Sequence, residues 1–274
     1  MEGRLPSRGL IAYRPARAAL GGTEAECPTC AEMRHRPSLR GHAAIAPYAL
    51  GMVRKNDQPI PPRLPSELLS QREMRLTGET DLYRLRFEGE FSGAQGAGIT
   101  IEESHIARAS FVGADLGRLR LVDVLVEESN FSGADMQEAS FTRVTFRGCR
   151  MSGALMPHTY LQDVVFSECK LDGVNFRMSK GDRVVFDHVN LRQAELISAH
   201  LKSTCFFDCD MQETDVSQAV LPAARFHGSV LSDIKGGEYL RDVVIDSSQV
   251  LPLASRVFSA FNIRVQDERN APPS

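Results

Sequence analysis

Large apolar residues recur at every fifth position between Phe91 and Leu231. Of the 29 positions in this register, 27 are Phe, Leu, Ile, Met or Val, and the exceptions are Gly96 and Gly181. The register two residues earlier is just as regular, because 27 of its 29 positions are Ala, Val, Cys, Ser, Thr or Gly. An α-helix repeats its apolar face every three or four residues and a strand every two, so neither explains this period. We predict a tube in which five residues form each short side, with the large and the small residue turned inward.

The same stretch carries many copies of a short motif in which a small residue, Asp or Asn, and a large apolar residue follow one another. It resembles the pentapeptide-repeat family, whose consensus is Ala-(Asp/Asn)-Leu-x-x. The matching segments include Ala114-Asp115-Leu116, Ala134-Asp135-Met136, Val174-Asn175-Phe176, Val189-Asn190-Leu191 and Ala194-Glu195-Leu196. The resemblance implies an all-β solenoid, namely a right-handed quadrilateral β-helix with four pentapeptides in each coil. The 29 pentapeptides then make about seven coils.

Residues spaced by 20 positions should lie above one another if each coil has four sides. Five phenylalanines in a row follow this spacing: Phe146, Phe166, Phe186, Phe206 and Phe226. Neighbouring strands lie about 4.8 Å apart, so we expect these rings to stack along the core.

The repeats divide the chain into four parts. We expect a flexible or mostly disordered leader over residues 1–60 and an N-terminal cap over 61–90, with a short helix from Ser66 to near Arg75. The solenoid occupies 91–235. A last strand and a capping helix with a tail follow over 236–274, because Leu251, Leu253, Val257, Phe258 and Phe261 give that segment an apolar face.

Two glycines interrupt the core register. Gly181 replaces a large residue, and we expect the chain to kink or bulge there. Gly96 marks a loose first coil, and the small register has its own misfits at Ile99 and Leu119.

Charge, hydropathy and cysteine content indicate the cellular compartment in which we expect the protein. Residues 1–80 carry a net charge of +4 and residues 81–240 a net charge of −7. The sequence contains no apolar run long enough to cross a membrane, and we expect no signal peptide because Arg14 and Arg17 interrupt the apolar segment near its start. Cys149, Cys169 and Cys209 fall on the small inward register, where a reduced thiol fills space. We therefore expect a cytoplasmic protein with no membrane association.

One group of residues in the leader has metal-binding chemistry. Cys27 and Cys30, followed by His35 and His42, offer two thiolates and two imidazoles to a zinc ion. The short spacing between the two pairs does not suit the usual zinc finger, so a cysteine pair without metal is the favoured interpretation. The chain has no phosphate-binding loop, zinc-protease motif or nucleophile elbow. We expect no enzyme activity and no cofactor.

An acidic stripe is predicted along one side of the tube. Asp115, Asp135, Glu195 and Asp215 precede core positions of that side, with Leu155 and Asn175 in the middle. The resemblance implies that such a stripe can mimic DNA, bind DNA gyrase and protect it from quinolones. Asp and Asn are also consensus residues at this position, so the stripe is explained without any function.

An apolar row is predicted on the side that carries the phenylalanines. Leu125, Val165 and Val185 point outward, and Phe207 follows a core position of the same side. This row suits a protein-docking surface or a dimer contact, although ordinary β-propensity explains it as well. The leading prediction is a non-enzymatic protein-interaction scaffold with an unknown partner and no direct nucleic-acid binding. The resemblance also implies a homodimer through the C-terminal helix.

Overall fold

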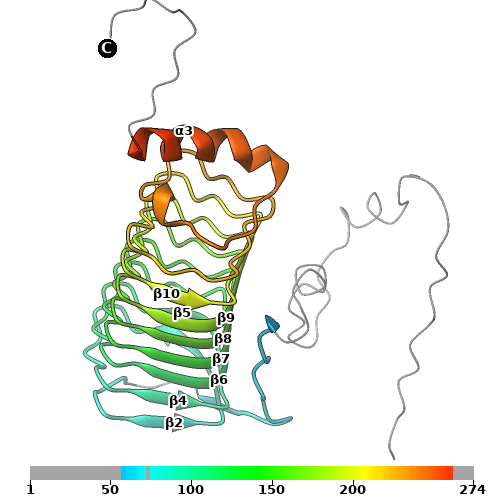
Figure 1. The fold of residues 1–274 in the computed structure, drawn as a ribbon. Helices are drawn as coiled ribbons and strands as arrows, with labels where there is room; N and C mark the ends of the chain where they lie inside the picture. The colour runs from blue at the N-terminus through cyan, green and yellow to red at the C-terminus, as the bar shows by residue number, and fades with distance from the viewer. Residues whose placement is uncertain (1–56, 72–74, 262–274) are drawn as a thin grey trace, which may run out of the picture. The chain divides into compact units, whose positions relative to one another are not determined.

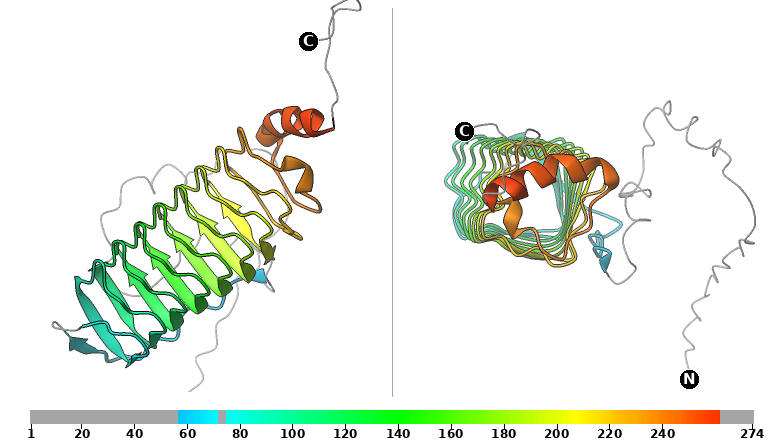
Figure 2. Two further views of the ribbon diagram at one scale, coloured as in Figure 1. Left: turned by 90° about the vertical axis from the view of Figure 1, so that its left-hand side faces the viewer. Right: turned by 45° about the horizontal axis from the view of Figure 1, so that its top comes forward.

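The described part of the chain forms a four-sided parallel β-solenoid in a computed structural model (Figure 1). The structure describes residues 57–71 and 75–261. Successive coils stack along one axis, and a view close to that axis shows the four sides (Figure 2). The predicted quadrilateral β-helix of about seven coils is confirmed.

The strands are short and come from one or two sides of each coil. They are β1 (Leu69–Gln71), β2 (Asp81–Tyr83), β3 (Leu85–Glu90), β4 (Thr100–Glu102), β5 (His105–Ser110), β6 (Arg120–Glu127), β7 (Ser140–Arg147), β8 (Tyr160–Ser167), β9 (Lys180–Asp187), β10 (His200–Lys202) and β11 (Cys205–Phe207). Two 3-10 turns, η2 (Gly237–Tyr239) and η3 (Ser247–Gln249), and the helix α3 (Val250–Ala260) follow.

The pairing register shows that each coil contains 20 residues. Val144 of β7 pairs with Val164 of β8, and Val164 pairs with Val184 of β9, all in parallel. The remaining sides carry isolated parallel bridges with the same spacing, such as Asp115 to Asp135. Four pentapeptides therefore form each turn of the solenoid.

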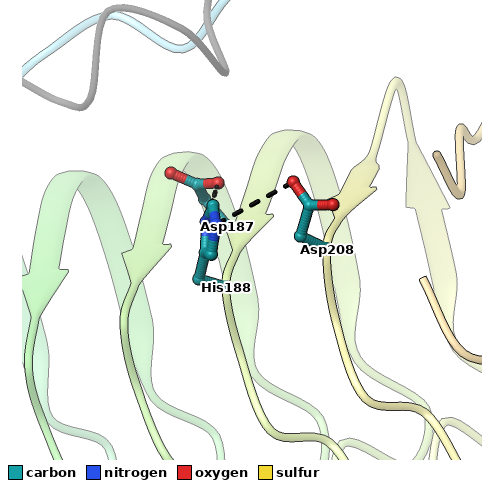
Figure 3. A group of neighbouring side chains, drawn as sticks. All are labelled: Asp187, His188 and Asp208. Carbon is teal, nitrogen blue, oxygen red and sulfur yellow. Dashed lines mark hydrogen bonds and ion pairs between the residues drawn. The ribbon is translucent and has the colours of Figure 1, made fainter. Parts of the chain in front are cut away.

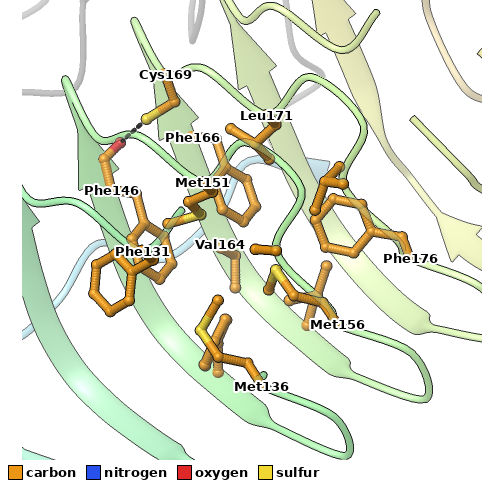
Figure 4. Packing of buried hydrophobic residues seen from close by; sticks show 14 of the residues in the cluster. Phe131, Met136, Phe146, Met151, Met156, Val164, Phe166, Cys169, Leu171 and Phe176 are labelled. Carbon is orange, nitrogen blue, oxygen red and sulfur yellow. Dashed lines mark hydrogen bonds between the residues drawn. The ribbon is translucent and has the colours of Figure 1, made fainter. Parts of the chain in front are cut away.

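Ladders of aromatic rings occupy the core, as the 20-residue spacing predicts. Centroid distances along the ladder from Phe146 to Phe226 are 5.0, 5.0, 4.9 and 4.9 Å, and the rings are parallel within 6°. Phe131 and Met151 lie on the neighbouring side of the same core (Figure 4). These side chains are almost completely buried and form one continuous apolar core along the solenoid.

Every side ends in a residue with left-handed backbone. All 29 positions two residues after a core position, from Gly93 to Asp233, have a φ angle between 46° and 78°. This conformation turns the chain through a corner before the next side begins. Eight of these residues are glycines and 21 are not.

The first coil differs from the prediction. Leu69–Gln71 is a strand that pairs with β3, so the helix expected from Ser66 to near Arg75 is wrong. The exposed backbone edge of β3 supplies partners for these N–H and C=O groups, and pairing satisfies them. The pairing of β3 with β5 shifts register between Phe87 and Gly89, where the sequence spacing is one residue short.

The C-terminal segment covers the last coil, as predicted, and α3 lies across that end of the solenoid (Figure 2). Asp246 caps η3 in a reciprocal capping box with Gln249. The buried Gln249 side chain donates hydrogen bonds to the backbone oxygens of Phe226 and Ser229. The expected last strand is reduced to a single bridge between Arg225 and Val244.

Both interrupting glycines sit in regular structure. Gly181 pairs with Leu161 and Leu201 without a register shift, so the expected kink is wrong. A Cβ at Gly181 would lie 2.9 Å from Leu201 Cδ2, which shows that neighbouring side chains fill the space. At Gly96 a Cβ would lie 2.6 Å from Ile99 Cδ1, so the misfit Ile99 occupies the volume that Gly96 leaves.

In the part of the chain that the structure describes, no helix is long and apolar enough to cross a membrane.

Candidate functional site

The acidic residues of the repeats have a local structural role. Oδ1 of Asp115, Asp135 and Asp215 accepts a hydrogen bond from the backbone N–H two residues later, at 3.2, 3.0 and 2.9 Å. Asn175 makes the same contact with Arg177. These contacts close a turn at the corner of the coil. The structure therefore explains why Asp and Asn recur at this position.

The acidic stripe is assembled on one side as predicted. Bridges with 20-residue spacing align Asp115 with Asp135 and Glu195 with Asp215, with Leu155 and Asn175 between the two pairs. The four acidic side chains are half-buried. Arg177 lies 3.6 Å from the Glu195 carboxylate and reduces the negative charge there.

The apolar row is not on the free surface. Leu125, Val165, Val185 and Phe207 are all at most 5% exposed. Val165, Val185 and Phe207 form a small apolar cluster with Cys205, separate from the main core. The predicted docking residues therefore come together, but other parts of the chain bury them.

The segment of residues 57–65, which we call the strap, lies along the outside of the solenoid beside this row (Figure 1). The Ser203 hydroxyl donates to Asp57 Oδ1 at 3.1 Å. The N–H of Ile60 donates to Asp163 Oδ1 at 3.0 Å, and the N–H of Arg63 donates to Asp123 Oδ1 at 2.9 Å. The leader was expected to be flexible to residue 60, yet these contacts hold its last residues against the solenoid. Residues 1–56 lie outside the described residues.

Cys205 belongs to the small apolar cluster of this row and is buried. Burial raises the pKa of its thiol to about 11; the charge of Arg225 acts against this rise, and the carboxylate of Asp57 adds to it. The hydrogen bonds of Asp57, Ile60 and Arg63 with Ser203, Asp163 and Asp123 place the strap beside the column that runs from Leu125 to Cys205. We call this column, with Asp123, Asp163 and Ser203, the strap groove.

Arginines of the solenoid hold the two aspartates of the strap groove. Arg143 donates to both carboxylate oxygens of Asp123 at 2.7 and 2.6 Å, and Arg183 donates to both of Asp163 at 2.6 and 2.9 Å. Burial pushes the pKa of Asp123 upward, but the hydrogen bonds from Arg143 and the Arg63 N–H outweigh it and lower the pKa. Both acceptors are thus oriented by arginines of the solenoid itself.

A second polar cluster lies nearby, on the phenylalanine side of the solenoid (Figure 3). His188 Nδ1 lies 2.8 Å from Asp187 Oδ1, and His188 Nε2 lies 3.9 Å from Asp208 Oδ2. Burial raises the pKa of Asp187, and the hydrogen bond from His188 offsets only part of this effect. The three ligand atoms lie within 4.8 Å of one another, a spacing that suits a divalent ion, but each imidazole nitrogen already faces a carboxylate. The sequence predicts only an exposed surface position for His188. It does not show the contact with Asp208, because Asp208 comes from the next coil.

The helix α3 exposes apolar side chains at the end of the solenoid. Leu251 is 82% exposed, and Phe258 and Phe261 are also exposed. Leu253 packs against the core from the same segment. Among the described residues, the capping helix therefore exposes apolar side chains where the sequence predicts a dimer contact.

Sequence signals account for only part of these features. The repeat register locates the acidic stripe and the apolar row, whereas nothing in the local sequence shows that the strap binds there. The zinc candidates Cys27, Cys30, His35 and His42 lie outside the described residues.

Two family models match the repeat region. One, described as pentapeptide repeats in eight copies, matches residues 109–153. The other, described as a pentapeptide repeat region, matches residues 139–214. A comparison with curated proteins gives no match.

Solved structures of low identity are also similar. Trypsin-treated QnrB1, a plasmid-mediated fluoroquinolone resistance protein, is 18% identical, with 72% of this chain and 100% of that chain covered and a TM-score of 0.34. HetL, involved in heterocyst differentiation regulation in Nostoc sp. strain PCC 7120, is 14% identical over 62% and 89% of the two chains, with a TM-score of 0.24. Rfr23 from Cyanothece 51142 is 13% identical over 65% and 88%, with a TM-score of 0.16. Values this low carry no information about function.

Proposed function

Residues 109–214 consist of pentapeptide repeats, so the chain is a pentapeptide-repeat protein, and on this premise we propose that it is a non-enzymatic scaffold that binds other proteins along its solenoid. Stacked coils present columns of outward side chains at regular spacing, which suits extended partners.

One observation carries this proposal. The outside of the solenoid already binds an extended segment, since the strap contacts Asp123, Asp163 and Ser203 at intervals of 40 residues, or two coils. The contacts combine backbone hydrogen bonds with burial of an apolar row. A surface that holds its own chain in this way has the chemistry needed to hold another chain.

The test uses immobilised full-length protein as bait, followed by production of each retained partner and calorimetric titration. Four charge reversals, one on an exposed position of each side, locate the contact: Lys170→Glu, Glu138→Lys, Lys202→Glu and Glu168→Lys. We expect one of the four to weaken binding at least tenfold and the others to match the wild type. A partner that binds all four variants alike, or no retained partner, would contradict a side-specific scaffold.

DNA mimicry is the second candidate, because the structure aligns Asp115, Asp135, Glu195 and Asp215 on one side. In this proposal the stripe binds DNA gyrase in place of duplex DNA. Its charge density is low: four carboxylates over six coils about 4.8 Å apart give one carboxylate every 7 Å or so, against about 1.7 Å per charge in duplex DNA. The turn-closing hydrogen bonds also give these carboxylates a structural reason to be present. The scaffold is therefore the preferred function.

A gyrase supercoiling assay distinguishes the two functions. DNA mimicry predicts inhibition, or protection from a quinolone, that fades between about 50 and 200 mM salt because screening weakens interactions between charges. It also predicts loss of the effect in Asp115→Lys/Asp135→Lys. If micromolar protein has no effect in this assay, DNA mimicry is excluded and the scaffold function remains.

A further inference from the structure

We propose that the strap groove is a binding site for proline-rich segments of partner proteins in the polyproline II conformation, and that the strap is its internal ligand when no partner is bound. The inference rests on the proposed scaffold function and names the class of segment that the scaffold binds.

The repeat of the groove matches the repeat of a polyproline II helix. Ile60 and Arg63 are three residues apart in the strap. Their partners Asp163 and Asp123 are 40 residues apart, which is two coils of the solenoid. Polyproline II rises by about 3.1 Å per residue, or about 9.3 Å for three, and two coils rise by about 9.6 Å. An α-helix, at about 1.5 Å per residue, does not match this rise. A β-strand, at about 3.3 Å per residue, matches the rise as well as polyproline II does, but its two-residue period would turn Ile60 and Arg63 to opposite sides.

Proline has the same period on the inner side of the strap. Pro59 is buried, and Pro62 and Pro65 are half-buried. Ile60, Pro61 and Arg63 between them are exposed, with Ile60 at 43%, and Leu64 is half-buried. Three residues per turn place every third side chain on one face, so the proline rings at 59, 62 and 65 face the groove.

The hydrogen bonds fit the same repeat. Polyproline II makes no internal hydrogen bonds, so the N–H of each residue that is not proline needs an external acceptor. Ile60 and Arg63 each follow an inward proline, and their N–H groups bind Asp163 and Asp123. The groove therefore recognises a proline followed by a residue with a free N–H, repeated every three residues.

The acceptors belong to the solenoid and do not depend on the strap. Asp163 is 2% exposed and is held by two hydrogen bonds from Arg183, and Asp123 is held likewise by Arg143. The apolar floor, with Val165 and Val185, is also part of the repeat register. The site thus remains formed when its occupant changes.

Recognition uses groups that any proline-rich segment of this spacing offers. The contacts to Asp123 and Asp163 are made by backbone N–H groups, and the buried and half-buried residues of the strap include its three inward prolines. The strap competes with a partner because covalent attachment gives it an effective concentration in the millimolar range. A partner must therefore present a longer or better-fitting segment, or the strap must be weakened.

The experiment measures fluorescence anisotropy of a labelled peptide that repeats residues 57–66, titrated with the full-length chain. The weakened strap is Pro59→Ser/Pro62→Ser, which removes two inward rings. Its matched control is Ile60→Ser/Pro61→Ser, which changes two exposed side chains and keeps the inward prolines. We expect the weakened-strap variant to bind the peptide at least tenfold more tightly than the wild type, and the control to bind as the wild type does.

Two further arms test the groove and the peptide separately. Val165→Asp in the weakened-strap chain should abolish binding, with circular dichroism confirming the fold. Should that variant fail to fold, a peptide with serine in place of its three inward prolines carries the same test and should not bind. A weakened-strap chain that fails to bind the peptide, or binds no better than the wild type, would overturn the proposal. A partner retained in the bait experiment on another side would still support the scaffold, so the two failures are distinguishable.

Discussion

Left-handed backbone at every fifth residue explains a rule of composition in the repeats. None of the 29 positions with positive φ from Gly93 to Asp233 is Val, Ile, Thr, Phe or Leu. A β-branched side chain is strongly disfavoured in this conformation, whereas Gly, Asp and other unbranched residues tolerate it. At Gly93, Gly113, Gly133, Gly153 and Gly173 a Cβ would meet nothing within 4 Å, so backbone conformation, not packing, favours glycine there.

The Ile99 side chain fills the core space that Gly96 leaves empty in the first coil. We expect Gly96→Leu alone to cost about 1–3 kcal/mol because the new side chain meets Ile99. Ile99→Ala alone should cost about 2–5 kcal/mol because it leaves a cavity. The double variant should lose at least about 1 kcal/mol less free energy of unfolding than the two single losses added together. Urea unfolding measures all three losses.

The control for this cycle combines Gly96→Leu with Val164→Ala, a buried residue three coils away. These two changes should add within about 0.5 kcal/mol. Simple additivity of the Gly96 and Ile99 changes would show that the two residues do not share one space.

The buried carboxylate of Asp187 should destabilise the fold at neutral pH. Because burial raises its pKa, the folded protein binds this proton more tightly than the unfolded chain does, and stability falls as pH rises through that range. We expect Asp187→Asn to be more stable than the wild type at pH 7. The difference should vanish below about pH 3.9, the ordinary pKa of Asp, where the wild-type side chain is neutral in both states.

Urea midpoints of both proteins between pH 3.5 and 8 measure this difference. Asp208→Asn serves as control, because the Asp208 side chain is half exposed and loses little hydration on folding. An Asp187→Asn protein that is less stable than the wild type at pH 7 would mean that the His188 contact outweighs burial.

At the scale of the strand, the phenylalanine ladder makes β9 depend on both of its neighbours. The Phe186 ring stacks on Phe166 at 5.0 Å and on Phe206 at 4.9 Å. We expect Phe186→Ala to destabilise the protein by about 3–5 kcal/mol and Phe186→Leu by clearly less, since leucine refills part of the volume.

Chemical unfolding measures the global cost, and hydrogen exchange should show the largest loss of protection in β8, β9 and β11, because each coil depends mainly on the adjacent coils. Met178→Ala, at a half-exposed side chain, is the control and should change stability by no more than about 0.5 kcal/mol. Loss of protection spread evenly over all strands would argue against this local coupling.

The repeat register predicted what depends on spacing within the solenoid. The columns of Phe146 and Asp115 follow directly from a 20-residue coil. It could not predict the kink-free strand at Gly181, since the space is filled by the side chains of Leu201, one coil above, and Val184. The register also does not show that Leu125 and Val165 are covered. Their cover is a segment with a different period, and its backbone binds carboxylates that lie 60 and 103 residues later in the chain.

At the scale of the whole molecule, the exposed face of α3 is our proposed homodimer contact. Leu251 and Phe258 lie seven residues apart, two turns along the helix, and therefore share a face. We expect the wild type to elute as a dimer in light-scattering chromatography at micromolar concentration, and Leu251→Asp/Phe258→Asp to elute as a monomer with an unchanged circular dichroism spectrum.

Val112→Asp/Leu155→Asp changes two exposed apolar residues of the solenoid and should leave the dimer intact. A wild-type protein that stays monomeric up to about 100 µM would exclude the proposed dimer contact through α3.

The order in which the strap contacts its groove has a consequence for synthesis of the chain on the ribosome. The three contacts span 60, 103 and 146 residues, so the partner of Arg63 is made first and that of Asp57 last. At about 5–20 residues per second, the 146 residues between Asp57 and Ser203 take on the order of 10 s to translate. The strap therefore closes one contact at a time, from its C-terminal end, as each pair of new coils emerges. Until Ser203 has emerged, the nascent protein carries a partly filled groove and a loose proline-rich segment on the same chain.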